Sequence, residues 1–169
     1  MKAKTKNNKS NFFISNIVYV LLLGLILRLF LSFFGTLQLD QGTFIAWSNN
    51  LVNGGFKTFY NGWSDYLPGY LYILWVLGKI NLLNIFPATV LYKLPAIFSD
   101  ILTGYLVYKI LKKNKSEWLG IAGSLAYILN PAVLINSSLW GQVDSLTALA
   151  AISSIYLFDK YYIFSAVLL

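Results

Sequence analysis

The sequence predicts an all-α fold: a polytopic bundle of transmembrane helices whose large first outer loop carries two juxtamembrane helices. Apolar residues make up 57% of the 169 residues and charged residues only 11%, and the mean hydropathy is +0.63. These values are typical of proteins that cross a membrane several times. Lysines gather beside long apolar runs, as the positive-inside rule describes. The net charge of +7 therefore predicts orientation in a membrane and no nucleic-acid partner.

The sequence contains no Cys and no His. This composition excludes disulfides, thiol chemistry, histidine acid–base catalysis and most zinc sites. We predict no cofactor and no metal-ligating residues, and the sequence leaves the need for a divalent cation open.

The apolar runs predict five membrane spans. The first, 12–34, follows a basic N-terminus that the charge rule places in the cytoplasm. It is longer than the apolar core of a signal peptide and lacks a small-x-small cleavage site, so we expect a retained helix. The later spans are 88–111, 118–137, 146–158 and 161–169. Because the chain ends inside the fifth run, we expect residues 1–169 to be a single, C-terminally incomplete module of a multi-pass cell-membrane protein.

The apolar segment 68–83 requires a choice between a span and a surface helix. It is short and contains Gly78 and Lys79. Counting it as a crossing would place the lysines of 112–115 outside, against the charge rule. We therefore expect residues 35–87 to form one outer loop, with surface helices at about 40–53 and 68–83.

Four of the six carboxylates lie in or beside apolar segments, where an ionisable group is costly and marks a functional candidate. Asp40 suits a general base for an acceptor hydroxyl or amine. Its local sequence favours an N-cap, and the two roles are compatible. Asp65 stands before Pro68 in an aromatic region that suits either a sugar-stacking surface or a membrane belt. Asp100 suits a structural ion pair with Arg28. The fourth acid, in the segment WGQVDS, suits either a helix cap or an outward-facing polar pocket.

Several segments, in their order, resemble the GT-C superfamily of integral membrane glycosyltransferases, which use polyprenyl-phosphate-linked sugars. They are LDQGTFIAW, DYLPGY, KLPAIFSD and NPAVLINSSLWGQVDS. In DYLPGY, Leu67 stands where relatives often carry Pro. The likeness extends over about 110 residues, to the N-terminal part of a mannosyl- or glucosyltransferase-like enzyme, and this chain is shorter than such enzymes.

The resemblance implies a role for each candidate residue. Asp40 would be the catalytic base, and Arg28 and Lys93 would bind phosphate. The residues implied in substrate binding are Trp47, Asp65, Tyr66, Trp140, Gln142 and Asp144. The implied partners are a polyprenyl-phosphate sugar donor, a glycan, lipid or protein acceptor, and membrane lipid.

The function expected on these grounds is transfer of a hexose to an extracytoplasmic acceptor with inversion at the anomeric carbon. Two alternatives stay open. A transporter or flippase-like module would also place acids and cations inside the bundle, with helix breaks near the bilayer midplane. A catalytically incomplete fragment would bind or assemble without turnover.

Overall fold

The computed structural model describes residues 2–64, 66–114 and 116–168. In these ranges all regular secondary structure is helical, which confirms the all-α fold class. The helices are α1 (Lys2–Leu31), α2 (Gln38–Gly54), α3 (Phe56–Phe59), α4 (Pro68–Asn81), α5 (Ala88–Leu91), α6 (Leu94–Asn114), α7 (Glu117–Ile128), α8 (Pro131–Leu134), the π-helix η1 (Ile135–Trp140), α9 (Asp144–Leu157) and α10 (Tyr162–Val167).

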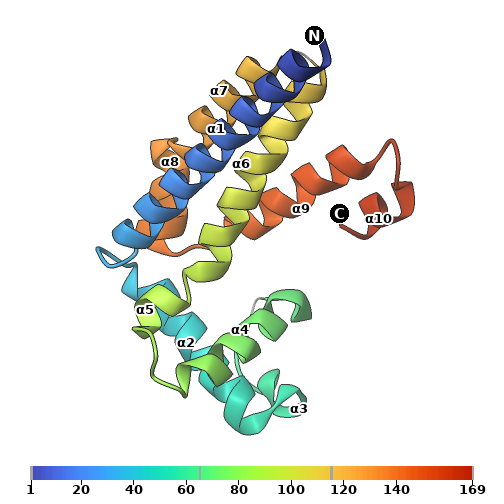
Figure 1. The fold of residues 1–169 in the computed structure, drawn as a ribbon. Coiled ribbons are helices and arrows are strands. Elements are labelled where there is room, and N and C mark those ends of the chain that lie inside the picture. Colours follow the sequence, from blue (N-terminus) through green and yellow to red (C-terminus); the bar gives the residue numbers. More distant parts are fainter. Residues whose placement is uncertain (1, 65, 115, 169) are drawn as a thin grey trace.

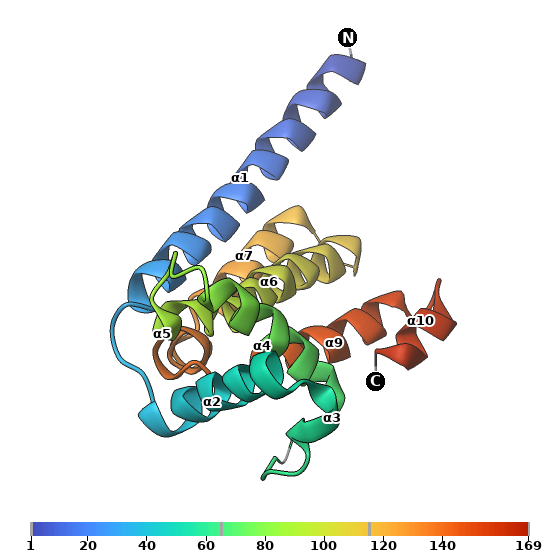
Figure 2. The same cartoon turned by 90° about the horizontal axis from the view of Figure 1, so that it is seen from below.

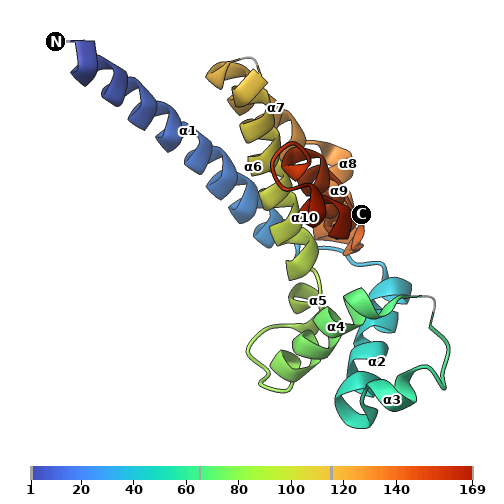
Figure 3. The same ribbon diagram turned by 90° about the vertical axis from the view of Figure 1, so that its right-hand side faces the viewer.

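The helices form two groups (Figure 1). In the first group, called the bundle, α6 packs against α1, α7, η1 and α9. The group also includes α8, which contacts α7 and η1, and α10, which packs against α9. The second group, called the loop unit, contains α2 to α5, with α2 and α4 side by side (Figure 2). The N-terminal half of α1 extends away from α6 and α7, whereas its C-terminal end lies near the loop unit (Figure 3).

Helices α2 and α4 lie where the sequence predicts the two surface helices. The structure adds the short helix α3 between them. Whether they lie along a membrane stays a prediction, because the structure contains no membrane.

The segment expected as a single span at 88–111 lies in one apolar helix of sufficient length to cross a membrane, Ala88–Lys113. A turn within it separates α5 from α6. The division falls at Tyr92 and Lys93, just before Pro95 in the first turn of α6. Because Pro95 has no backbone N–H, it cannot donate to the carbonyl of Leu91 and continue one unbroken helix.

The segment expected as one span at 118–137 is bent by 49° between α7 and the α8–η1 pair. Asn130 ends the first part, and its side chain accepts a hydrogen bond of 2.9 Å from the backbone N–H of Ala132. Pro131 then begins α8. An Asn cap followed by Pro at the first position is a helix-start signal, so a new helix begins where the prediction continued the old one.

One helix in the described part of the chain, Ala88–Lys113 with α5 and α6 taken together, is long and apolar enough to cross a membrane. A second stretch is long and apolar enough if α7 and the bent segment α8–η1 are counted as one span. Asn16–Leu31 and Asp144–Leu157 are shorter apolar helices. These statements rest on length and composition alone. The number of spans therefore stays a prediction.

An aromatic core holds the loop unit together. Trp47 of α2 contacts Phe59 and Tyr66, with ring centroids 6.1 and 5.3 Å apart. Leu71 and Leu74 of α4 are fully buried against the same cluster. The apolar face of α4 therefore packs on α2, so the two helices form one folded unit beside the bundle.

We expect Leu71→Ala to lower the free energy of unfolding by about 2–5 kcal/mol, because it leaves a cavity in this core. The measurement is thermal or denaturant unfolding in detergent, followed by tryptophan fluorescence. Leu67→Ala is the matched control, since Leu67 is 83% exposed just before α4, and its expected change is within about 0.5 kcal/mol. Equal losses in the two variants would contradict this account of the core.

Candidate functional site

The candidate site forms where the start of α2 meets the loop between η1 and α9. The backbone N–H of Leu37 donates to the carbonyl of Trp140 at 3.5 Å. The buried Gln41 side chain donates through Nε2 to the carbonyl of Gly141 at 3.0 Å. These contacts join the loop unit to the bundle across a sequence separation of about 100 residues.

The carboxylate of Asp40 receives two side-chain hydrogen bonds at this junction. Oδ2 accepts from Trp140 Nε1 at 2.8 Å and from Gln142 Nε2 at 2.5 Å. Oδ1 accepts none from the residues that the structure describes. Asp40 also lies in the first turn of α2, where the helix dipole favours a negative charge. One oxygen of the carboxylate is thus fixed by two donors and the other by none of the described residues.

Gly141 shapes the loop that carries these donors. Its φ of 87° lies in the left-handed region, which glycine adopts without steric cost. The backbone N–H groups of Gly141 and Gln142 both donate to the carbonyl of Asn136, at 2.9 and 3.0 Å. A Cβ at Gly141 would also overlap the side chain of Gln41. The sharp turn therefore places Trp140 and Gln142 on either side of a glycine that fits against α2.

Lys93 binds the connection between α1 and α2, which leads to the candidate site. Its ammonium group donates to the carbonyls of Ser32 and Gly35, at 3.0 and 2.7 Å, and the residue has no exposed surface. These carbonyls follow the end of α1, where the helix dipole favours a cation. Two of the three N–H groups of Lys93 are therefore used to hold the connection from α1 to α2. Its predicted role in phosphate binding stays a prediction.

Arg28 lies in a different position from that expected of a phosphate ligand. It is fully buried in α1, and Nε lies 3.2 Å from Asp100 Oδ2 of α6. Its Nη1 donates to the carbonyl of Ile128 at 2.9 Å, and Tyr127 donates to Asp100 Oδ1 at 3.1 Å. Arg28 and Asp100 thus form the interhelical ion pair that the sequence offered as the structural interpretation of Asp100.

Asp144 lies outside the Asp40 contact network. Its Oδ2 accepts from Asn136 Nδ2 at 3.1 Å, and the residue begins α9. Asp144, Asn136, Asp100 and Tyr127 line one cavity of about 290 Å³. Asn136 Oδ1 is buried there and has no hydrogen-bond partner among the described residues. The structure therefore divides the predicted site residues between two neighbouring places.

A larger groove of about 540 Å³ lies between α4 and α9. Tyr66, Tyr70 and Ile73 line one side, and Val143 and Thr147 line the other. Burial, with smaller contributions from Tyr66 and Tyr92, raises the pKa of Tyr70 well above that of a free phenol, so its hydroxyl stays protonated. The groove thus has an aromatic, neutral wall.

The remaining predicted substrate residues have separate positions. Trp47 is buried in the aromatic core, with Nε1 donating to the carbonyl of Trp63 at 3.2 Å. It therefore supports Tyr66 from behind the groove, because the two rings are in contact. Asp65 lies outside the described residues.

Sequence reasoning missed Tyr127 and Asn136, which contribute polar atoms to the smaller cavity. Tyr127 carried a weak signal, since it is a polar aromatic residue one turn before the Asn130-Pro131 break. Among the described residues, no three His, Cys, Asp or Glu side chains come together as a metal site. The need for a divalent cation stays open.

Comparison with known proteins gives no relative: no family model, no curated protein and no solved structure matches the chain.

We expect Asp100→Asn to destabilise the fold by about 3–5 kcal/mol, because it leaves the buried Arg28 guanidinium without a charged partner. The free energy of unfolding in detergent measures the effect. The control is Asp159→Asn, which removes the pair with Lys113, a 3.8 Å contact between side chains that are 83% and 69% exposed. That change should cost about 0–1 kcal/mol.

The double variant Arg28→Met, Asp100→Leu distinguishes the cost of an unpaired buried charge from the cost of altered packing at these two positions. It replaces the ion pair with apolar side chains, and we expect it to recover most of the stability that Asp100→Asn loses. A double variant as unstable as the single one would show that packing at these positions, rather than the unpaired charge, sets the loss.

Proposed function

We propose that the chain is the outward-facing catalytic part of a polytopic membrane glycosyltransferase, one that moves a hexose from a polyprenyl-phosphate donor to an extracytoplasmic acceptor with inversion. Asp40 is the general base. The observation that carries the proposal is the position of its carboxylate, which is held by Trp140 and by Gln142, the residue before Val143 of the aromatic groove. The resemblance of the sequence motifs to the GT-C superfamily supports the same assignment.

The hydrogen bonds of Asp40 suit a base better than a structural cap. Trp140 and Gln142 are neutral donors, so they orient the carboxylate and leave its charge uncompensated. Both bonds go to Oδ2. Oδ1 is therefore the oxygen that would accept the proton of an acceptor hydroxyl.

Two connections support a position of Asp40 near the groove. Val143, which lines the groove, directly follows Gln142 in the chain. Phe44, one turn after Asp40 in α2, packs against the rings of Tyr66 and Tyr70 at centroid distances of 5.8 and 5.6 Å. Tyrosine rings present apolar faces on which a sugar ring or an isoprenoid chain would pack. The groove is therefore the proposed donor cavity.

The transfer step uses one carboxylate. The acceptor O–H gives its proton to Asp40 as its oxygen bonds to the anomeric carbon. On the opposite face of the sugar, the bond from that carbon to the phosphate oxygen breaks, and the polyprenyl phosphate leaves with the electron pair. Such an anion needs cationic stabilisation rather than protonation. Lys93 remains the candidate cation, and Arg28 is not assigned this role because Asp100 pairs with it in the buried bundle.

The proposed orientation places the loop unit outside and the end of α6 in the cytoplasm. Lys93 and Lys113 are twenty residues apart, which corresponds to about 30 Å along a helix and matches the thickness of a hydrocarbon core of about 30 Å. Lys112 and Lys113 then lie on the inner side, as the charge rule requires.

Two observations favour the rival function of a transporter or flippase-like module. Arg28 Nη2 is buried without a partner among the described residues, beside the ion pair with Asp100. The chain also bends by 49° at Asn130, between α7 and α8. These features suit a substrate path within the bundle. They do not explain why Trp140 and Gln142, about 100 residues away in the sequence, both donate hydrogen bonds to Asp40.

We expect Asp40→Asn to lower the turnover number by about 10²–10⁴-fold, because an amide cannot accept the proton. The assay uses the purified chain in detergent with a polyprenyl-phosphate hexose and an acceptor glycan. Asp159→Asn is the control, since Asp159 is exposed at the other end of the bundle, and it should keep full turnover. Undiminished turnover in Asp40→Asn would remove Asp40 as the base. A chain that binds donor but never turns over would support the incomplete fragment.

The orientation can be tested by cysteine labelling, because the sequence contains no Cys. In sealed cells, we expect Lys57→Cys to react with an impermeant maleimide and Lys113→Cys to react only after permeabilisation. The lysines lie in α3 and near the end of α6, respectively. Reaction of both, or protection of Lys57→Cys alone, would overturn the arrangement.

A further inference from the structure

We propose that an anionic phospholipid binds between α6 and α9 at the end of the bundle away from Asp40. Its phosphate lies on Lys113, and one acyl chain follows Ile110 and Ile155. The inference rests on the membrane placement proposed above and is independent of the transfer chemistry.

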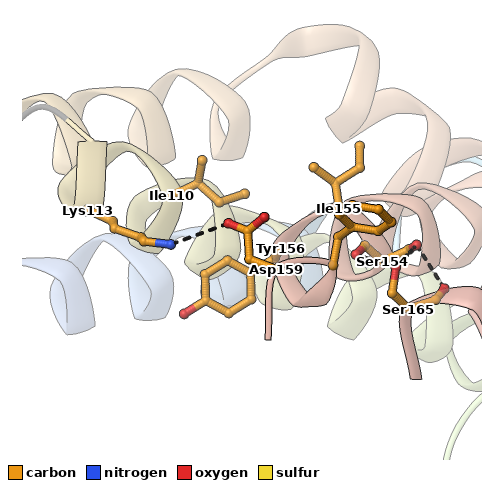
Figure 4. Close-up of a pocket in the computed structure, with 8 residues that line it drawn as sticks. Ile110, Lys113, Ser154, Ile155, Tyr156, Asp159 and Ser165 are labelled. Atoms are coloured by element: carbon orange, nitrogen blue, oxygen red, sulfur yellow. Dashed lines mark hydrogen bonds and ion pairs between the residues drawn. The ribbon is translucent and has the colours of Figure 1, made fainter. Parts of the chain in front are cut away.

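A cavity of about 480 Å³ provides the headgroup position. Figure 4 shows Lys113 and Asp159 facing each other at one end of it, with Tyr156 beside them. The cavity is lined by Ile110, Lys113, Ser154, Ile155, Tyr156, Phe158, Asp159 and Ser165. It is therefore polar at the end where Lys113 lies and apolar along its sides.

A second groove, of about 220 Å³, continues the cavity along the bundle. The two share Ile110 and Ile155, and the groove is completed by Val107, Leu111 and Ile152. All five of these side chains are apolar. A cavity with a charged end that leads into an aliphatic groove has the amphipathic form of a phospholipid, whereas a free phosphate would leave the groove empty.

Lys113 is the cation available to the headgroup. Its pair with Asp159 is long, at 3.8 Å, and solvent-exposed, so it holds the ammonium weakly. Lys112, in contrast, donates to Glu117 at 2.6 Å and to Tyr108 at 3.1 Å. A phosphate that approached this end would therefore meet Lys113 without first breaking a strong contact.

The charge around the cavity selects an anionic lipid. Lys112 and Lys113 end α6, and Lys160 follows α9. Asp159 is the one acid that lines the cavity. With Glu117, the partner of Lys112, it stands against three lysines, so the local balance stays positive. Under the charge rule this end faces the cytoplasmic leaflet, whose anionic lipids attract basic residues near the membrane surface.

The wall beside Ile155 is fixed by a pair of serines. Ser154 Oγ donates to the carbonyl of Ser165 at 2.8 Å, and Ser165 Oγ donates to the carbonyl of Ser154 at 2.8 Å. Both residues are buried, and together they fasten α10 to α9 (Figure 4). The cavity is therefore bounded by hydrogen-bonded helices rather than by loose side chains.

The test is native mass spectrometry of the full chain released from detergent micelles that contain equal amounts of phosphatidylglycerol and phosphatidylcholine with the same acyl chains. We expect the chain to retain phosphatidylglycerol selectively. Lys113→Gln should reduce that retention about fivefold, the effect of one lysine near an anionic surface. The matched control is Lys109→Gln, which removes the same charge from the same helix outside the cavity. It should leave retention unchanged.

Two further variants test each part of the site. Ile155→Trp fills the apolar groove at an exposed position and should reduce retention with Lys113 intact. Asp159→Asn removes the carboxylate that competes with the lipid phosphate for Lys113, and it should increase lipid retention. Soluble glycerol phosphate should not displace the lipid.

Equal retention of the two lipids would show that no site for an anionic lipid exists here. Equal loss of retention in Lys113→Gln and Lys109→Gln would show a diffuse attraction between the lipid and the basic end of α6 in place of a specific site. A lipid-free dimer would show that a second copy covers the groove. If the chain did not prefer phosphatidylglycerol but its turnover still depended on Asp40, the lipid site would be ruled out and the proposed glycosyl transfer would stand. The two outcomes are separable because the two sites lie at opposite ends of α6.

Discussion

The buried ion pair between Arg28 and Asp100 is the constraint on which the rest of the arrangement depends. It joins α1 to α6, and the hydrogen bond from Arg28 to the carbonyl of Ile128 adds the end of α7. A charge buried among apolar helices is tolerated only with a partner, so these helices cannot slide independently. The fixed end of α1 then presents the carbonyls of Ser32 and Gly35 to Lys93. The direction in which α2 begins, and hence the position of Asp40, follows from two buried cations.

The candidate site is consequently a property of two units rather than of one segment. The loop unit supplies the carboxylate, and the bundle supplies both of its donors. Neither unit alone holds Asp40 in position. The groove is also shared, since Tyr66 and Tyr70 of the loop unit form one wall and Val143 and α9 form the opposite wall. A cavity between two separately packed units is a common position for a ligand site.

The sequence predicted the helical fold and the positions of α2 and α4 because apolar runs and charge placement are local signals. The charge rule alone also predicted that Asp40 and the segment WGQVDS lie on the same side of the membrane. The bend at Asn130 was missed, because apolar composition continues through it. The separation of Asp144 from Asp40 was missed for another reason. It depends on the turn at Gly141 and on the partner chosen by Asn136, and neither is visible in residue type or spacing.

The π-helix that precedes the Asp40 donors has a consequence for register. A π-turn accommodates one more residue than an α-turn, and each residue of an α-helix rotates the chain by about 100°. Trp140 closes η1, so removal of a single residue between Ile135 and Leu139 would restore α-helical winding and turn the indole away from the carboxylate. Every residue that forms the contact would still be present. The contact therefore depends on how many residues precede Trp140 as much as on which residues they are.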